Sequence, residues 1–296
     1  MSSKFSEGIK VSVFVVCYNH EKFIEKALNG ISNQKTNFDY EVLIYDDFST
    51  DNTRVIIDKF VLNNKNCTLR KIYAEENQYS KGITMSSVII PKAKGEFIAF
   101  CEGDDYWLDE NKLQKQYDNM INKPQLNACF HPVYTLIDDQ LLDKKYGYLG
   151  DNEQLVSFKT IIKKGGGYMP MASLFIRTKP FLELIAKKPD FFLYNCEHSV
   201  LQIINSVDKG ALYIPGYMSV YRSMHEGSWS LQQAKDPTAE DREFEQYKIR
   251  ILGLNKIYHY KYWTCFLGIY LKKSKKHYRK KIKRWFKTKV SRPKIR

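Results

Sequence analysis

The 296-residue chain lacks the short motifs that mark several large protein classes. No apolar run is followed by a glycine-rich phosphate loop of the Gly-x-Gly-x-x-Gly or Walker type, which argues against dinucleotide-dependent oxidoreductases and P-loop NTPases. The six cysteines include no Cys-x-x-Cys pair, which argues against a structural zinc site and fits the cytoplasm. Internal repeats are absent as well.

Membrane-spanning and secretory segments are not expected either. The aromatic segment 257–271 contains no uncharged stretch longer than residues 262–271, far short of the roughly 20 residues that span a bilayer. Lys10 and the apolar run after it lead directly into Tyr18, which is not the pattern of a signal peptide. We therefore expect a cytoplasmic protein.

Positive charge is concentrated at the C-terminal end. Of the 47 Lys and Arg residues, 14 lie in residues 272–296, where no Asp or Glu occurs, and the other 33 balance the 33 acidic residues. Helical spacing places Tyr278, Ile282, Trp285 and Phe286 on one face among these basic residues. This pattern predicts a helix on an anionic membrane surface at the inner face of the cell membrane. Nucleic acid is the less favoured partner, and a solubilising tail is the third alternative.

Apolar runs that end in polar residues recur three times in the first 121 residues. They cover residues 11–17, 40–45 and 97–101, and a helical pattern follows each polar turn. Asn19 and Ser49 are candidate caps for the first two helices. The alternation predicts an α/β fold with a doubly wound, mainly parallel sheet, which binds ligands at the carboxyl ends of its strands.

Three carboxylates follow the third apolar run within four positions: Glu102, Asp104 and Asp105. Such charges repel one another unless a cation lies between them, and a hard divalent ion such as Mg²⁺ or Mn²⁺ prefers oxygen ligands. The alternative is a solvated acidic turn that caps the helix beginning near Asp109.

The order of these motifs resembles that of glycosyltransferase family 2. The matching segments are residues 11–13 (VSV) with Tyr18-Asn19, residues 46–53 (DDFSTDNT), residues 94–98 (KGEFI) and residues 102–105 (EGDD). The resemblance covers about residues 9 to 230. It implies the Rossmann-like GT-A fold, a nucleoside-diphospho-sugar donor, expected to be a UDP-sugar, and inversion at the anomeric carbon.

The resemblance also assigns roles in donor binding. Asp47 corresponds to the residue that accepts a hydrogen bond from the uracil imide, and Tyr18 to the residue that lines its ring. Asn19 is assigned to the same site.

In the third motif, Asp104 matches the metal ligand of the family's Asp-x-Asp sequence. Glu102 stands in place of the first Asp, so its role is either a ribose contact or one linked to the metal. Gly103 is assigned to donor binding with them, and Asp105 either contacts the sugar or is structural.

Relatives carry an acidic general base just before a helix in the second half of the domain. Glu197 precedes the apolar pattern that begins at Val200 and is the expected base. His198 is a rival, because its ordinary pKa suits proton transfer better. A third reading is that Glu197 only favours the helix N-terminus through the helix dipole.

A later segment of the family closes over the donor diphosphate. Here a strand-like run ends at Arg222, a candidate phosphate partner, and His225 is the candidate that completes the metal shell. The remaining candidates are two hydroxyl donors to phosphate and an aromatic cover that excludes water: Ser228, Ser230 and Trp229.

We expect a catalytic domain over residues 1–240 and a helical, aromatic and basic, membrane-associating extension over residues 241–296. The expected activity is metal-dependent transfer of a hexose or N-acetylhexosamine to a glycan or lipid-linked acceptor in synthesis of a bacterial surface polysaccharide, lipopolysaccharide or capsule. The alternative is a non-catalytic nucleotide-sugar-binding scaffold at the membrane. A nucleotidyltransferase would need a glycine-rich loop at the first strand, where this chain has Cys-Tyr-Asn-His.

Overall fold

The computed structural model describes residues 8–63, 67–164 and 168–290, without the side chains of residues 143–145 and 284–290. The chain divides into two compact units, Met1–Gly227 and Ser228–Arg296. Each unit is described by itself.

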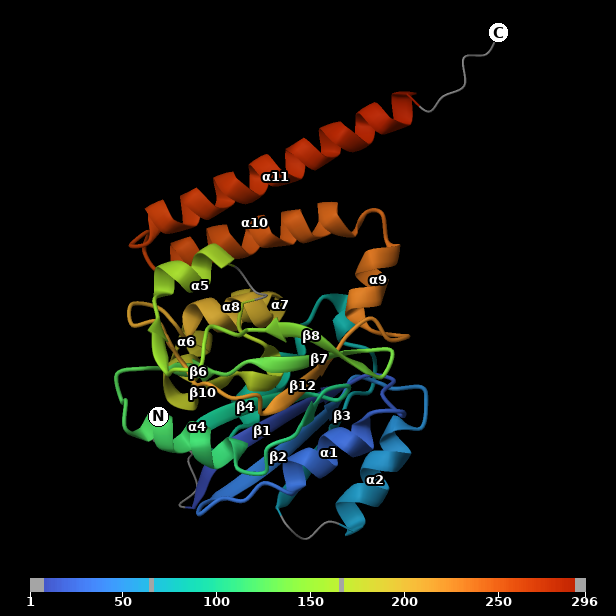
Figure 1. Cartoon of the computed structure of the whole chain (residues 1–296), viewed down its shortest axis with the longest axis vertical. Coiled ribbons are helices and arrows are strands. Elements are labelled where there is room, and N and C mark those ends of the chain that lie inside the picture. Colours follow the sequence, from blue (N-terminus) through green and yellow to red (C-terminus); the bar gives the residue numbers. More distant parts are fainter. Residues whose placement is uncertain (1–7, 64–66, 165–167, 291–296) are drawn as a thin grey trace. The chain divides into compact units, whose positions relative to one another are not determined.

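The first unit is built on a mixed sheet, in which eight strands are found among the described residues, in the order β3-β2-β1-β4-β10-β6-β11-β9 (Figure 1). Neighbouring strands of the first half pair in parallel: β3 (Thr68–Tyr73), β2 (Asp39–Asp46), β1 (Ile9–Cys17) and β4 (Phe97–Glu102). The second half mixes directions: β10 (Phe175–Arg177), β6 (Ala128–Phe130), β11 (Ala211–Tyr213) and β9 (Gln154–Val156). The predicted α/β fold with a mainly parallel sheet is therefore confirmed.

A smaller sheet carries the strand that leads into the second half of the site. Its order is β5 (Tyr106–Trp107), β12 (Ser219–Arg222), β7 (Val133–Ile137) and β8 (Gln140–Tyr146). The helices of this unit are α1 (Ile24–Ser32), α2 (Thr53–Asn63), α3 (Met85–Ile89), α4 (Lys112–Ile121), α5 (Phe158–Lys164), α6 (Thr178–Lys187), α7 (Pro189–Asn195) and α8 (His198–Ile204). Short 3₁₀ turns cover Tyr79–Lys81, Ile90–Lys92 and Met171–Ser173.

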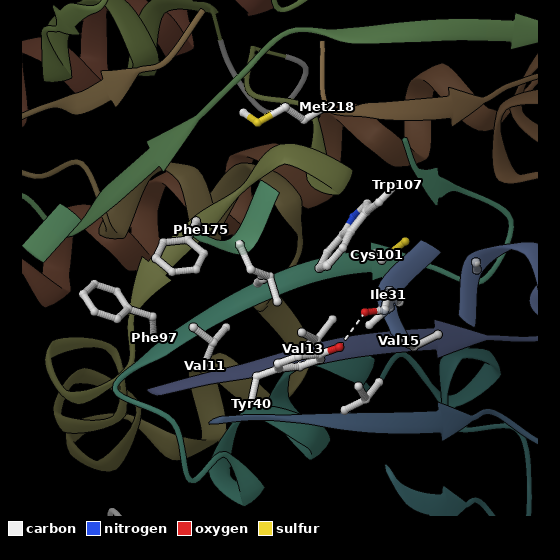
Figure 2. Packing of buried hydrophobic residues seen from close by; sticks show 14 of the residues in the cluster. Val11, Val13, Val15, Ile31, Tyr40, Phe97, Cys101, Trp107, Phe175 and Met218 are labelled. Atoms are coloured by element: carbon white, nitrogen blue, oxygen red, sulfur yellow. Dashed lines mark hydrogen bonds between the residues drawn. The ribbon is translucent and has the colours of Figure 1, made fainter. Parts of the chain in front are cut away.

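The main core lies against the parallel strands (Figure 2). Alternation along β1 places Val11, Val13 and Val15 on one face, where all three are fully buried. The rings of Phe97 and Phe175 stack at 5.0 Å between centroids and join β4 to β10. Because each buried apolar side chain of this size contributes about 1.5–3 kcal/mol, the core holds the strand ends rigidly.

Two expected helix caps are wrong. The residue at the N-cap of α1 is Phe23, whereas Asn19 has a positive φ of 55° and its Oδ1 accepts from the Thr50 backbone N–H at 2.8 Å. Ser49 contacts the carboxylate of Asp46, so it serves the strand end and not α2. These side chains tie the loops after β1 and β2 to each other. Sequence spacing cannot distinguish such a tie from a cap, because the same residue types make both.

A lysine is buried at the start of α4. The Lys112 ammonium donates to Gln116 Oε1 at 2.7 Å and lies 3.9 Å from the centroid of the Trp107 ring. Burial lowers the pKa of Lys112 from 10.5 to about 7. At pH values between about 7 and 10.5, Lys112 binds a proton in the unfolded chain but not in the folded chain, so the free energy of unfolding rises with pH.

Lys112→Met is expected to flatten this dependence. Between pH 7 and about 8.5 the free energy of unfolding of the wild-type chain should rise by about 1.5 kcal/mol more than that of the variant. Urea unfolding at several pH values measures the difference, with the exposed Lys115→Met as control. Buried thiols such as Cys17 and Cys101, whose pKa values burial raises, add the opposite slope as the pH passes the ordinary thiol pKa of about 8.5, and they do so in wild type and variant alike. Equal slopes for wild type and Lys112→Met would contradict the assignment.

The second unit is helical, with α9 (Trp229–Lys235), α10 (Ala239–Ile257) and α11 (Trp263–Val290). The helical spacing of Phe244, Tyr247, Ile251 and Leu254 gives α10 one apolar face, and all four side chains are buried. Phe244 stacks on His277 of α11 at 4.3 Å between ring centroids. No helix in the described ranges is long and apolar enough to cross a membrane. Trp285 and Phe286 lie outside the described side chains.

Candidate functional site

The site begins where β1, β2 and β4 end together. Cys17 pairs with Asp46, and Val16 pairs with Glu102. The backbone N–H groups just beyond the strands continue the pairing, from Asp47 to the Cys17 carbonyl at 2.9 Å and from Gly103 to the Val16 carbonyl at 2.8 Å. The polar residues after all three strands therefore share one edge of the sheet, as predicted.

Gly103 lies where two turns come too close for a side chain. A Cβ at this position would be 2.7 Å from His20 Nδ1 and 2.8 Å from Cys17 Cβ. The glycine thus allows the turn after β4 to approach the turn after β1. Its immediate effect is to place Asp104 beside His20.

Asp104 is the centre of the site. Its Oδ2 lies 2.9 Å from His225 Nε2 and 4.0 Å from His20 Nε2. Burial would raise the pKa of the Asp104 carboxyl, but the His225 hydrogen bond and the two imidazoles outweigh it and lower that pKa. The structure therefore brings Asp104 and His225 together, although they lie 121 residues apart in the sequence. Two side chains that bind one metal ion must lie this close to each other.

A carboxylate oxygen beside an imidazole suits a divalent cation that is shared with a ligand. Within the described residues no three His, Cys, Asp or Glu side chains form a metal cage of their own. Mg²⁺ in proteins is commonly held by one or two carboxylates together with substrate phosphates and water. Asp104 can supply such a carboxylate, and His225 offers a nitrogen ligand beside it.

Asp105 and Arg222 connect the turn after β4 to strand β12. Asp105 is buried, and its Oδ1 accepts from the Arg222 backbone N–H at 2.8 Å. Burial, followed by the charges of Asp104 and Glu102, raises the pKa of Asp105 well above its ordinary value. The contact with Arg222 fits the structural alternative for Asp105, and a contact with the sugar stays a prediction.

The Arg222 guanidinium is directed to protein partners. It donates to the Asp104 carbonyl at 3.1 Å and to Asp139 Oδ1 at 3.0 Å, and it lies 4.5 Å from the centroid of the Phe23 ring. These contacts hold the turn that carries Asp104 against β12. A phosphate contact for Arg222 stays a prediction.

Glu197 and His198 start the helix on the other side of the turn. Glu197 occupies the N-cap position of α8 with an extended backbone, and its side chain makes no capping hydrogen bond. His198 Nε2 lies 3.2 Å from Glu102 Oε1. Desolvation lowers the pKa of His198, but the Glu102 carboxylate together with the charges of Glu197 and Asp104 outweighs it, so the net shift of that pKa is upward.

The predicted nucleobase partners differ in accessibility. Tyr18 is 42% exposed, whereas Asp47 is fully buried. The Asp47 carboxylate accepts from the backbone N–H groups of Gln78 at 2.9 Å and Tyr79 at 3.0 Å, and from the Tyr45 hydroxyl at 3.2 Å. In this conformation a uracil imide would compete with those donors, so the base contact stays a prediction. Asn19 lies in the loop after β1, and its side chain binds Thr50 in the loop after β2.

Ser228, Trp229 and Ser230 begin the second unit. Ser228 caps α9, since its Oγ accepts from the Leu231 backbone N–H at 3.2 Å. Trp229 is 53% exposed on the first turn of that helix, and Ser230 Oγ lies 3.2 Å from Ser228 Oγ. Their contacts with a donor stay predictions.

Sequence reasoning missed three residues of this region. His20 flanks Asp104, Asp139 binds Arg222, and Phe48 is 42% exposed with a positive φ of 69° beside Asp47. The place of His20 at a strand end was a usable signal. Asp139 and the backbone of Phe48 gave none, because their roles arise from tertiary packing.

Comparison with known proteins identifies a protein family for the first unit. The sequence model described as Glycosyl transferase family 2 matches residues 12–177. Uncharacterized protein Rv1520 of Mycobacterium tuberculosis is 30% identical over 223 residues, 74% of this chain and 60% of its own. The chain thus spans about 60% of the length of the curated relatives that it matches first.

Two relatives have named activities. The E. coli UDP-Glc:alpha-D-GlcNAc-diphosphoundecaprenol beta-1,3-glucosyltransferase WfgD is 27% identical over 62% of this chain and 68% of its own. The S. aureus poly(ribitol-phosphate) beta-N-acetylglucosaminyltransferase TarS is 40% identical over 101 residues, 33% of this chain and 17% of its own. The crystal structure of TarS residues 1–349 with UDP-GlcNAc superposes with a TM-score of 0.59 at 18% identity, over 83% of this chain and 67% of that one. This likeness shows a shared GT-A-like fold.

Proposed function

Because the chain belongs to glycosyltransferase family 2, we propose that it transfers one sugar from a nucleoside-diphospho-sugar to an acceptor hydroxyl with inversion. The observation that carries the proposal is the pairing of Asp104 with His225 at 2.9 Å, at the edge of the sheet. Glu197 is connected to the same edge, because its neighbour His198 contacts Glu102. These contacts support a site that combines a metal-binding group with a candidate base.

The donor is proposed to be a UDP-sugar that carries a hexose or N-acetylhexosamine. Tyr18 is exposed next to Asp47 and can cover a nucleobase ring. The names of two relatives point to the same donor class, since WfgD uses UDP-Glc and TarS was solved with UDP-GlcNAc.

Asp104 and His225 would hold Mn²⁺ or Mg²⁺, which neutralises charge on the departing diphosphate when bound. Arg222 and Asp105 keep this pair in place through the bonds that join β12 to the turn. Glu197 takes the proton of the acceptor hydroxyl as that oxygen attacks the anomeric carbon from the face opposite the diphosphate. Trp229 excludes water from the donor in this proposal.

The acceptor is proposed to be a glycan or lipid-linked saccharide of a bacterial surface polymer. TarS acts on poly(ribitol-phosphate) and WfgD on a diphosphoundecaprenol-linked sugar, according to their names. The catalytic part would cover residues 1–240, and residues 241–296 would hold the enzyme at the cytoplasmic face of the membrane.

A thermal-shift screen of nucleotides tests donor binding. UDP or a UDP-sugar at about 100 times its Kd should stabilise the folded chain by about 2.7 kcal/mol, which raises Tm by about 5 °C or more. Mn²⁺ should enlarge the shift in the wild-type chain and not in Asp104→Asn. Shifts that do not depend on the nucleotide or the metal would contradict the donor proposal.

The basic face of α11 is expected to bind anionic membranes. Five exposed cations, Lys272, Lys275, Lys276, Arg279 and Lys283, can be changed together to Gln. Because each cation near an anionic surface contributes up to about 1 kcal/mol, five of them contribute up to about 5 kcal/mol, and the variant should bind vesicles with phosphatidylglycerol on the order of 10²–10³-fold more weakly at low salt. Cosedimentation measures this, and an unchanged fraction on the vesicles would remove α11 as the anchor.

A matched control separates the position of the charges from their number. The same change at five exposed lysines of the first unit, Lys92, Lys115, Lys159, Lys187 and Lys188, should leave vesicle binding nearly intact. Trp285 and Phe286 are predicted to supply the part of binding that survives about 0.5 M salt. Their change to Ser tests that part.

A further inference from the structure

The contact between Glu102 and His198 joins the two halves of the site. Glu102 is the last residue of β4, two positions before Asp104, and His198 is the first residue of α8, directly after Glu197. Their side chains meet at 3.2 Å although 96 positions separate them in the sequence. The His198 side chain is 48% exposed and that of Glu102 33%, so the contact lies in the wall of the site and not in the core.

The segment that carries Glu197 is fixed on both sides. On one side the Cys196 backbone N–H donates to Thr84 Oγ1 at 3.2 Å. On the other side His198 is held by Glu102. The far half of α8 is fixed separately, because Gln202 Nε2 donates to the Met169 carbonyl at 2.7 Å.

The His198 contact therefore links the start of α8 to the turn that carries Asp104. Its removal should leave the bonds of Cys196 and Gln202, and with them the fold of α8, in place. The distance between the Glu197 backbone and Asp104 would then be less tightly set. Catalysis is sensitive to such a change, because a misplacement of about 1 Å between reacting groups costs on the order of 10²-fold in rate.

The length of Glu102 matters for this tie. The Asp-x-Asp motif that residues 102–104 resemble has Asp at this position. An Asp side chain is shorter by one methylene, so its carboxylate would not reach His198 Nε2 from the same backbone position. Glu102 therefore makes a contact with His198 that the Asp of the motif would not make.

We propose that His198 is a positioning residue, which through Glu102 sets the placement of Glu197 relative to the metal-binding turn. This inference rests on the proposed function, in which Glu197 is the base. His198 contacts the protein and not the acceptor proton in this account.

Four variants test the tie: His198→Ala, Glu102→Ala, Glu102→Asp and Glu102→Gln. The first three should lower kcat by on the order of 10–100-fold with the donor KM changed less than about 2-fold. Glu102→Gln should lose less activity than Glu102→Ala, because its amide oxygen still accepts from the imidazole. The double variant His198→Ala/Glu102→Ala should be no slower than either single variant, because both remove one interaction.

Ser199→Ala, in the same turn of α8, is the control and should keep wild-type kcat. Thermal unfolding of every variant shows whether a lower rate reflects lost structure. A wild-type chain without turnover would refute the proposed function itself, whereas an active wild type with any of the following outcomes refutes only the tie.

Additive losses in the double variant would mean that the two residues act independently. A raised donor KM for Glu102→Ala with an unaffected His198→Ala would assign Glu102 to the ribose. A loss at His198 on the order of 10²–10⁴-fold with no effect of Glu102→Asp would make His198 the base.

Discussion

Asp104→Asn protein is expected to fold normally and to lose sugar transfer by on the order of 10²–10³-fold, about 3–4 kcal/mol of transition-state stabilisation. The amide keeps the size of the side chain and can still bond His225, but it gives up the negative charge that holds a divalent cation. Initial rates of UDP release at saturating donor measure the loss.

Chelation and a control variant complete this test. EDTA should reduce the wild-type rate to that of Asp104→Asn, and Mn²⁺ should restore the wild type alone. Asp118→Asn, on the exposed face of α4, should keep full activity. Undiminished transfer by folded Asp104→Asn, or full wild-type activity in EDTA, would overturn the metal-dependent reading.

Glu197→Gln is expected to bind UDP and metal like the wild type and to transfer sugar on the order of 10²–10⁴-fold more slowly. The reason is that the glutamine amide cannot accept the acceptor proton, while donor binding involves other side chains. Isothermal titration with UDP and Mn²⁺ measures binding, and single-turnover transfer measures the chemical step.

The ranking of neighbouring variants identifies the base. Glu197→Gln should be slower than His198→Ala, because His198 acts on the position of Glu197 and not on the proton. The reverse order would assign the base to His198. Loss of UDP binding in Glu197→Gln would instead mean that the segment shapes the donor site.

Local sequence patterns predicted the frame of the site well. The runs that became β1, β2 and β4 are short and apolar, and each ends in polar residues, so their type and order are encoded in neighbouring positions. The parallel arrangement then follows from the alternation with helices. That arrangement alone predicted that Tyr18, Asp47 and Asp104 share one edge of the sheet.

The protein partners of the site side chains were not predicted, because they depend on packing between distant segments. Arg222 was expected at a phosphate, but Asp139 and the Asp104 carbonyl occupy its guanidinium. Asp47 was expected to face a base, yet the backbone of Gln78 and Tyr79 occupies its carboxylate. Neither partner leaves a mark in the sequence around the residue that it binds.

The Asn19 loop shows the same limit on a smaller scale. An Asn three or four residues before an apolar helical stripe fits an N-cap, and the stripe itself, with Ile24, Ala27, Leu28 and Ile31 buried, is as expected. Asn19 nevertheless binds Thr50 across the loops. Whether Asn19 caps the helix or binds the other loop depends on the loop that follows the neighbouring strand β2. The spacing of residues around Asn19 carries no information about that loop.

Inverting sugar transfer is tested by an acceptor-dependent assay in which the product anomer is assigned. The full chain is incubated with Mn²⁺, each of a panel of α-linked UDP-hexoses and UDP-N-acetylhexosamines, and a lipid-diphosphate-linked sugar or a poly(ribitol-phosphate) acceptor. We expect UDP release that requires an acceptor and a product whose new bond is β by proton NMR. A retained α configuration, or binding of UDP-sugar with no acceptor-dependent release by a chain that shows the thermal shift, would contradict it, and the second result would favour a nucleotide-sugar-binding scaffold.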